Sequence, residues 1–344
     1  VDYTGAQSND SQSRNYSLEE YCTDIVDTLK NTLDEYDIKH PTIVTESGRA
    51  TVAYSSILLF NVLDVTKFEP IELPQIGDDE HQLLQDMREV LACLTPVKAQ
   101  ECYNDAHFYR DEIRELFKRG QVDLRTRSAA ENLFLEILQQ INKNLELMEH
   151  IPVDLEGLKE SLADIYYGNF SLFQSLPDIW AIDQLFPIMP IHRLEEEPTR
   201  NAIIADITCD CDGKIDKFIG QYEVSNTLPL HEMKDDEEYY MGVFLVGAYQ
   251  ETLGDLHNLF GDTNVVSVRL NEDSTFDFVK EIHGDTIADV LSYVEYQPKE
   301  MALRYRNTAE RAVKEGRITA RERQHMLKTY NASMQGYTYY ERDE

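Results

Sequence analysis

The stretch CDCDGKID, Cys209 to Asp216, places two thiols and three carboxylates within eight residues. These residue types could form a metal site, a redox pair, a turn or one half of a catalytic centre. A C-x-C pair lacks the second pair of ligands that a structural zinc site needs, and a disulfide between such close cysteines would be strained. Asp212 and Gly213 are typical of the tip of a turn. A turn does not explain Cys209 and Asp210, which follow the apolar segment NAIIADIT.

A second candidate stretch, TESGRA, spans Thr45 to Ala50 and overlaps the β-branched segment TIVTE. TIVTE predicts a short strand, and in β/α barrels the C-terminal ends of the strands carry the active site. Gly48 would let the backbone approach a phosphate closely, and Arg49 could donate two parallel hydrogen bonds to its oxygens. A surface turn with a local ion pair between Glu46 and Arg49 is an equally good interpretation.

A third candidate is the stretch FLVGAYQETLGDLHNLFGDT. The preceding residues and its first half, YYMGVFLVGAY, predict a nearly continuous buried strand that ends at Tyr249. A polar, aromatic loop with His257 follows this strand. The alternative is that Gly247 and Ala248 only pack against neighbours and that His257 is a core or helix-capping residue.

The spacing of apolar residues predicts the elements that position these stretches. Ser17 and Glu20 form a capping box in front of a helix that continues to about residue 38. Residues 81–151 have helical periodicity, and we expect their apolar stripe to pack in a core. The stripe consists of Leu133, Ile137, Leu138, Ile141 and Leu145. The stretch NVVSVRLNEDSTFDFVKEI predicts two strands around a turn at residues 271–274, and the C-terminal part is mostly helical.

The charge and the cysteine count exclude several classes of protein. A formal net charge of −32 disfavours binding to nucleic acid or to anionic lipid, and it would attract cationic substrates or products. Five cysteines without a disulfide-framework pattern indicate a reducing compartment. No apolar run approaches the roughly 18 residues that span a bilayer, and no signal peptide is visible. We therefore predict a cytoplasmic protein.

The three stretches occur in the same order in the alanine-racemase-like, fold type III decarboxylases that use pyridoxal 5′-phosphate. Within that group the chain resembles the C-terminal half of the biosynthetic arginine decarboxylases of bacteria and plants. The strings that carry the resemblance are HPTIVTESGRA, NFSLFQSLPDIWAIDQLFPIMP, DITCDCDGKID, TLPLHE and FLVGAYQETLGDLHNLFGDT. They span residues 40–263, which is most of the chain.

The resemblance implies a role for each site residue. Glu46 would face the pyridine nitrogen of the cofactor and keep it protonated. The cofactor phosphate would be held by Gly48, Arg49 and the Tyr249 hydroxyl. Cys209 would be the acid that returns a proton to the α-carbon after decarboxylation.

The resemblance also implies partners and a metal. Asp210 would pair with the distal cation of L-arginine, and the product would be agmatine for putrescine and spermidine biosynthesis. The Cys-Asp loop would reach into the site of a partner subunit, so we expect a homodimer or a higher homo-oligomer. Magnesium is implied as a further cofactor, although no metal-binding cluster stands out in the sequence.

Two departures from related patterns affect the substrate pocket. Ornithine enzymes carry a carboxylate where YYGNF has Phe170, which favours a longer substrate than ornithine. Asp178 or Asp183 could then hold the guanidinium, and a structural role for either is equally open. The segment TVAYSS lacks the paired histidines expected of this branch, and Tyr54 and Ser55 take their places.

The resemblance predicts an α/β plus β fold with four parts. Residues 1–70 would be the C-terminal end of the cofactor-binding β/α barrel, and residues 71–160 an inserted helical bundle. Residues 161–293 would form a Greek-key-like β domain that carries the Cys-Asp and Gly-Ala-Tyr motifs. Residues 294–344 would form a C-terminal helical segment.

The family's Schiff-base lysine and glycine-rich phosphate loop have no counterpart in this chain. We therefore expect that the chain is inactive alone, and that residues 1–70 expose apolar surface normally covered by the N-terminal half of the barrel. One alternative is a non-catalytic subunit that regulates or stabilises an active partner. Another is a preference for lysine, ornithine or diaminopimelate, which Phe170 disfavours. The helical residues 81–151 would either help to assemble higher oligomers or only pack within the chain.

Overall fold

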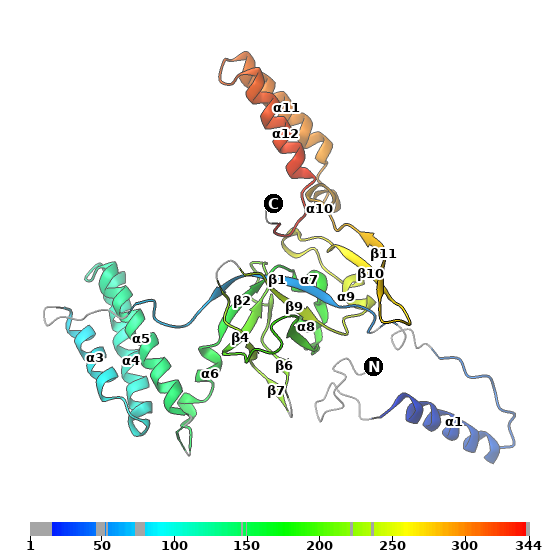
Figure 1. The fold of residues 1–344 in the computed structure, drawn as a ribbon, viewed down its shortest axis with the longest axis horizontal. Coiled ribbons are helices and arrows are strands. Elements are labelled where there is room, and N and C mark those ends of the chain that lie inside the picture. Colours follow the sequence, from blue (N-terminus) through cyan, green and yellow to red (C-terminus); the bar gives the residue numbers. More distant parts are fainter. Residues whose placement is uncertain are drawn as a thin grey trace.

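The computed structural model describes residues 16–341 except 46–51, 53, 73–79, 146, 149, 221–222 and 235–236. Glu46, Gly48 and Arg49, the predicted cofactor-binding residues, therefore lie outside the described residues. Figure 1 shows a central sheet with a helical bundle to its left and a helical hairpin that projects upward. The architecture is mixed α/β, as the sequence predicts.

The centre of the molecule is a mixed seven-stranded, barrel-like sheet with the order β3-β9-β1-β2-β4-β5, to which β8 adds by pairing with β4. Its strands are β1 (Leu58–Thr66), β2 (Asp164–Gly168), β3 (Ile188–Pro190), β4 (Arg200–Ala205), β5 (Lys214–Ile215), β8 (Leu228–Leu230) and β9 (Tyr239–Val243). Successive side chains of a strand point to opposite faces, so buried and half-buried positions alternate, as in β2. One continuous apolar core results, with Tyr166, Phe170 and Tyr239 among its largest side chains.

The strand directions bring four chain segments to the same edge of this sheet. β1 runs antiparallel to both β9 and β2, and β4 runs parallel to β2. The pairs Leu58 with Val243 and Tyr167 with Ala205 fix the register. The C-terminal ends of β2, β4 and β9 therefore lie at the same edge as the N-terminal end of β1.

Strand β9 is shorter than the sequence predicts. It ends at Val243, and the expected strand through Tyr249 is wrong. Leu245 and Gly247 have positive φ angles of 62° and 75°, and a left-handed backbone cannot continue a strand. A short helix, α9 (Ala248–Thr252), begins directly after this bend.

A separate bundle of helices precedes β2 in the sequence. It consists of α3 (Gln82–Cys93), the 3-10 turn η1 (Pro96–Lys98), α4 (Ala99–Lys118) and α5 (Leu124–Leu145). Four residues of the predicted stripe, from Leu133 to Ile141, are buried in the bundle core, and Leu145 packs against it half-buried. The sequence interpretation of the stripe as core is confirmed. The turn η2 (Val153–Leu155) and α6 (Leu158–Ser161) lead from the bundle to the sheet.

The C-terminal part combines a hairpin with three helices. Strands β10 (Val265–Leu270) and β11 (Phe276–Ile282) pair antiparallel, which confirms the predicted hairpin. The turn forms as expected, because the N–H of Ser274 donates to the carbonyl of Asn271. Helices α10 (Ile287–Tyr293), α11 (Pro298–Lys314) and α12 (Ala320–Met334) follow, and α11 and α12 form the projecting hairpin of Figure 1. No helix within the described ranges combines the length and apolar character needed to cross a bilayer.

The N-terminal part departs from the expected barrel remnant in two ways. Helix α1 (Leu18–Glu35) forms with its Ser17 capping box, but the strand predicted for TIVTE does not form in residues 41–45. A short β-branched run is not enough to form a strand, because a strand needs a neighbouring strand to pair with. Strand β1, which also belongs to the predicted barrel remnant, pairs between β2 and β9 in the central sheet.

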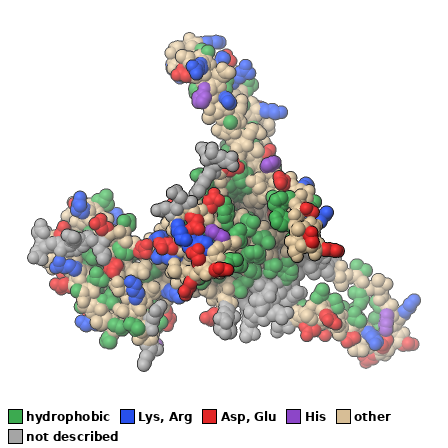
Figure 2. Space-filling view, viewed as in Figure 1, with side chains coloured by type: hydrophobic (Ala, Val, Ile, Leu, Met, Phe, Trp, Pro, Cys, Tyr) green, Lys and Arg blue, Asp and Glu red, His purple; other side chains and the backbone are tan. Residues whose placement is uncertain are grey.

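Helix α1 exposes the apolar side chains that the sequence predicts for this region. None of its side chains is buried, and Figure 2 shows hydrophobic groups on its surface. The exposed large residues between positions 16 and 57 are Tyr16, Leu18, Tyr21, Val26, Leu29, Tyr36, Ile38, Ile43, Val44, Tyr54 and Ile57.

Candidate active site

Two of the three candidate stretches lie at one edge of the central sheet. The Cys-Asp stretch follows β4, and the Gly-Ala-Tyr stretch follows β9. A hydrogen bond of 3.0 Å from the N–H of Val246 to the carbonyl of Ser56 ties the loop after β9 to the segment before β1. The sheet topology, rather than proximity in sequence, assembles the site.

The Cys-Asp loop contacts the loop after α9 through Asn258. The backbone N–H of Cys209 donates to Asn258 Oδ1 at 3.2 Å. Asn258 Nδ2 in turn donates to Cys209 Sγ, also at 3.2 Å. The Cys209 side chain is exposed, so the thiol lies at the surface of this chain.

A second contact between the same two loops joins Asp210 and His257. Asp210 Oδ2 lies 3.3 Å from His257 Nε2, and both side chains are about one-third exposed (33% and 32%). The His257 ring packs against Phe173, with 4.4 Å between the ring centroids. Neither of the alternatives for His257, a core residue or a helix cap, describes this position. The residue lies in the 3-10 turn η3 (His257–Leu259) and faces the Cys-Asp loop.

The buried side chain of Asp206 stabilises the Cys-Asp loop through hydrogen bonds. Its carboxylate accepts hydrogen bonds from the N–H of Leu172 and from the N–H and hydroxyl of Thr208. Burial raises the pKa of the Asp206 carboxyl, and the hydrogen bonds from Leu172 and Thr208 oppose this rise. Gly213 packs directly above, where a Cβ atom would lie 2.3 Å from Asp206 Oδ1.

Tyr249 is half-buried in the first turn of α9. The bend at Gly247 lies beside the segment before β1, since the N–H of Val246 donates to the carbonyl of Ser56. A hydroxyl is one of the donors that proteins use for phosphate, so Tyr249 fits the predicted contact with a phosphate-bearing cofactor. Tyr249 is the only predicted cofactor ligand among the described residues.

Comparisons with known proteins identify the family. The arginine decarboxylase helical bundle domain matches residues 77–159, and the arginine decarboxylase C-terminal helical extension matches residues 287–340. The biosynthetic arginine decarboxylase of Bacteroides thetaiotaomicron is 47% identical over 99% of this chain and 54% of its own length. The chain belongs to the biosynthetic arginine decarboxylase family.

Two further relatives agree with this assignment. The Thermosynechococcus vestitus biosynthetic arginine decarboxylase is 44% identical over 98% of this chain and 53% of its own length. The crystal structure of the Campylobacter jejuni biosynthetic arginine decarboxylase is 33% identical and has a TM-score of 0.81, covering 100% of this chain and 55% of that one. The chain therefore spans about half the length of the arginine decarboxylases that it matches.

The two carboxylates proposed to hold the guanidinium are both engaged within the chain. Asp178, at the start of α8 (Pro177–Ile182), accepts from Gln250 Nε2 at 2.7 Å, and its N–H donates to Gln250 Oε1. Asp183 ends that helix and pairs with Lys217 Nζ at 2.8 Å in an exposed position. These contacts favour the structural alternative for both residues in this chain.

Phe170 is a core residue in this structure. Its side chain is fully buried and stacks on Phe60 with 4.4 Å between ring centroids. An ornithine-type carboxylate at this position would have to be buried within the same apolar cluster, where an unpaired charge is costly. The aromatic residue is explained by packing against β1, independently of the substrate.

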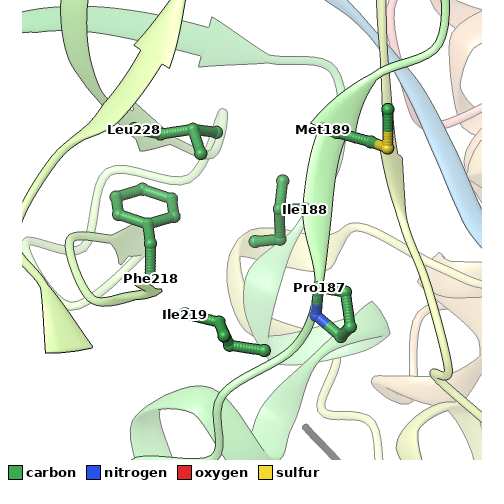
Figure 3. Close-up of a pocket in the computed structure, with 6 residues that line it drawn as sticks. All are labelled: Pro187, Ile188, Met189, Phe218, Ile219 and Leu228. Carbon is green, nitrogen blue, oxygen red and sulfur yellow. The ribbon is translucent and has the colours of Figure 1, made fainter. Parts of the chain in front are cut away.

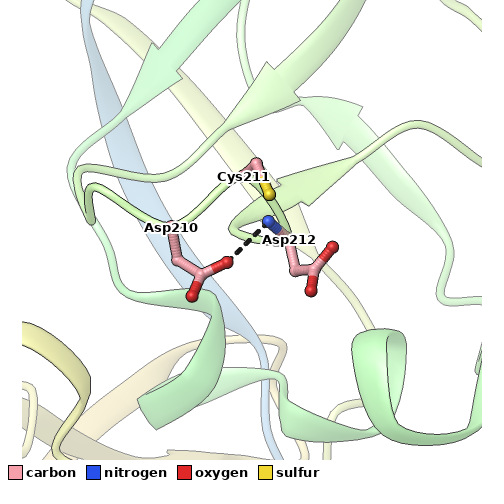
Figure 4. Close-up of side chains that lie close together, drawn as sticks. All are labelled: Asp210, Cys211 and Asp212. Carbon is pink, nitrogen blue, oxygen red and sulfur yellow. Dashed lines mark hydrogen bonds between the residues drawn. The ribbon is translucent and has the colours of Figure 1, made fainter.

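The acidic turn does not suit magnesium. Asp210, Cys211 and Asp212 are the one group of three potential ligands that lie within 4.8 Å of one another in the described part of the chain (Figure 4). Mg²⁺ prefers oxygen ligands in octahedral geometry, whereas a thiol is a soft ligand. Asp210 Oδ1 is also used locally, because it accepts from the N–H of Asp212 at 2.9 Å. This turn therefore does not fit the magnesium expected from the family resemblance.

A separate apolar pocket of about 220 Å³ lies between β3 and the β6 (Phe218–Ile219) region (Figure 3). It is lined by Pro187, Ile188, Met189, Phe218, Ile219 and Leu228. None of these side chains can transfer a proton or bind a charge. The pocket therefore contributes no group for acid–base catalysis or for binding a cationic substrate.

Sequence reasoning identified Cys209 and Asp210 but missed their partners. Asn258 and His257 lie 49 and 47 residues further along the chain, and no local pattern links them to the Cys-Asp motif. Asp206 lies within the apolar segment NAIIADIT and so attracts no separate attention. Two sequence features could have identified these residues. Asp206 lies near the end of this apolar segment, and Asn258 lies in the loop that follows the Gly-Ala-Tyr motif.

Proposed function

We propose that this chain supplies the C-terminal part of a pyridoxal-phosphate-dependent decarboxylase that converts L-arginine to agmatine and CO₂ for polyamine biosynthesis. The observation that carries the proposal is the 47% identity to a biosynthetic arginine decarboxylase over 99% of the chain. The chain matches about half of that relative, so the remaining site residues, including the Schiff-base lysine, would come from a further segment or chain.

The cofactor would supply the electron sink, and residues of the chain would bind and orient the cofactor. Bound pyridoxal phosphate supplies an electron sink for the pair of electrons that remains when CO₂ leaves. Glu46 would keep the pyridine nitrogen protonated, which strengthens this sink. Gly48, Arg49 and Tyr249 would bind the phosphate and so fix the orientation of the ring.

Cys209 and Asp210 would act on the substrate. The exposed Cys209 thiol suits delivery of a proton to the α-carbon of a substrate bound by a partner subunit, since its surface position leaves it accessible to a second chain. Asp210 would bind the cationic end of arginine, and the net charge of −32 would attract that cation. The active unit would then be a homodimer or a higher homo-oligomer.

The test is reconstitution of the complete enzyme from this chain and the N-terminal half of a relative, followed by assay of CO₂ and agmatine. Cys209→Ala should lower kcat by about 10²- to 10⁴-fold, the usual contribution of a positioned general acid. Cys211→Ala is the matched control, because Cys211 is an exposed thiol in the same turn. The chain without the added half should release no CO₂.

Three results would contradict the proposal. Full activity of Cys209→Ala in the reconstituted enzyme would indicate a subunit that regulates or stabilises an active partner. Preferential turnover of ornithine, lysine or diaminopimelate would show that the substrate assignment is wrong. Decarboxylation by the chain alone would show that it contains a complete site.

A further inference from the structure

Both polar atoms of the Asn258 side-chain amide form hydrogen bonds with Cys209. Asn258 Oδ1 accepts from the Cys209 backbone, and Asn258 Nδ2 donates to the Cys209 sulfur, each at 3.2 Å. We propose that Asn258 is a positioning residue that fixes the Cys209 thiol in one orientation for proton delivery. This role rests on the proposed function, and Asn258 would act through Cys209 without touching the substrate.

The direction of the second hydrogen bond matters for the chemistry. Because the sulfur accepts from Nδ2, the thiol proton takes no part in this bond and can point away toward the substrate. During transfer the S–H bond breaks, and the electron pair left at the α-carbon by CO₂ forms the new C–H bond. The sulfur keeps the S–H electron pair and becomes a thiolate, which water later reprotonates. The N–H of Asn258 then donates to a negative sulfur, and a hydrogen bond to a charged acceptor is stronger.

Asn258 is itself held by contacts that do not involve Cys209. Its φ of 55° is a left-handed conformation, which Asn adopts more readily than most residues. The neighbouring His257 ring packs on Phe173, and the N–H of Asp255 donates to the carbonyl of Phe173 at 3.0 Å. The turn η3 is therefore anchored to α7 (Leu172–Ser175), which the buried Asp206 also contacts. One rigid frame supports both the acid and the residue that orients it.

Two variants separate orientation of the thiol from simple support of the loop. Asn258→Asp keeps an acceptor for the Cys209 N–H but removes the donor to the sulfur and places a negative charge beside it. Asn258→Gly tolerates the left-handed backbone and removes both contacts. A residue that only supports the backbone would be replaced adequately by Asp, whereas a residue that orients the thiol would not.

In the reconstituted enzyme we expect Asn258→Asp to lower kcat about 10- to 100-fold, the effect of one hydrogen bond to a charged group, with KM for arginine within about twofold. In D₂O the parent should place deuterium in one stereochemical position of agmatine. The variant should give a mixture, because solvent can reach both faces. Unchanged kcat and a single stereochemical product in Asn258→Asp would overturn the proposal.

A second measurement does not depend on decarboxylation. The rate of Cys209 carboxamidomethylation by iodoacetamide, followed by peptide mass spectrometry on the chain itself, should fall about 3- to 10-fold in Asn258→Asp and Asn258→Gly. Cys211 in the same molecules is the internal control and should react within about twofold of the parent. If both variants leave the Cys209 rate unchanged, Asn258 does not act on the thiol. If arginine is not decarboxylated at all, the proposed function fails, and the alkylation result still decides the role of Asn258.

Discussion

At the scale of single residues, the Cys-Asp loop is supported by one buried polar side chain, Asp206, directly after β4. Asp206 is 4% exposed and accepts three hydrogen bonds from Leu172 and Thr208, so its charge is satisfied within the fold. Gly213 leaves the space that this carboxylate occupies. The loop that carries Cys209 and Asp210 follows Asp206 directly and depends on these contacts for its position.

Gly213→Ala should disturb the Cys-Asp loop. A Cβ atom would lie 2.3 Å from Asp206 Oδ1, so the carboxylate or the turn must move, and we expect a loss of about 1–3 kcal/mol in unfolding free energy. Urea denaturation measures this loss, and reconstituted activity should fall as well. Gly120→Ala is the control: its φ of 69° strains an alanine, but nothing lies within 4 Å and the site is untouched. Wild-type stability and activity in Gly213→Ala would contradict this role of Gly213.

Cys102 should resist alkylation in the native bundle. Burial, and secondarily Cys93, raise the pKa of the Cys102 thiol from 9.0 to about 11. The fold therefore favours the neutral thiol: this contribution to stability is fully present below pH 9 and is lost as the pH rises through about 11. Iodoacetamide at about pH 8, close to the pKa of a free thiol, should label the exposed Cys22 and leave Cys102 unlabelled until the chain is unfolded. Equal labelling of the two thiols in the native chain would refute the prediction.

At the scale of elements, a charge pair joins the parallel strands β2 and β4. Arg200 Nε and Nη2 donate to the two oxygens of the buried Asp164 at 2.6 and 2.9 Å. Hydrogen bonding to Asp164 raises the pKa of Arg200 further, so the guanidinium stays charged. The pair lies at the edge of the sheet opposite the site, since both residues begin their strands.

Arg200→Met should destabilise the sheet by about 3–5 kcal/mol, because it leaves Asp164 buried without a partner. Thermal and urea unfolding report the change. Arg306→Met is the matched control: Arg306 is 64% exposed and pairs with Glu310 at 3.7 Å, so its loss should change stability by less than about 1 kcal/mol. Similar effects of the two substitutions would argue against a structural role for the buried pair.

At the scale of the whole molecule, α1 carries an apolar stripe with no cover in this structure. Its residues Tyr21, Ile25 and Leu29 recur at spacings of four, yet none of the α1 side chains is buried. Figure 2 shows hydrophobic side chains on the surface of this helix. An amphipathic helix with an uncovered face is typical of a surface that another part of a protein covers.

The isolated chain should therefore bind a hydrophobic dye such as ANS through this helix. Replacing Val26 and Leu29, which are 48% and 39% exposed, by Glu should lower the fluorescence and any self-association. Lys30→Glu serves as a charge-matched control on the polar face. Adding the N-terminal half of a relative should suppress dye binding by the parent chain. Fluorescence that is unchanged by both the substitutions and the added half would show that the stripe is not the binding surface.

The sequence by itself determined the local elements and the chemistry of the motifs. The Ser17 capping box, the stripe at Leu133 and Ile137, and the turn after Asn271 depend on neighbours within a few residues, which the sequence displays directly. The Cys-Asp motif is visible in the sequence for the same reason.

Only the tertiary structure decided which residues meet. The pairing of β1 between β2 and β9, the end of β9 at Val243, and the contacts of Asn258 and His257 with Cys209 and Asp210 all depend on distant parts of the chain. Strand registry and left-handed bends are set by the packing of the whole sheet, and local propensity contributes little to either. The Cys-Asp motif can therefore be recognised in the sequence, whereas the amide of Asn258 that contacts Cys209 can be identified only in the folded chain.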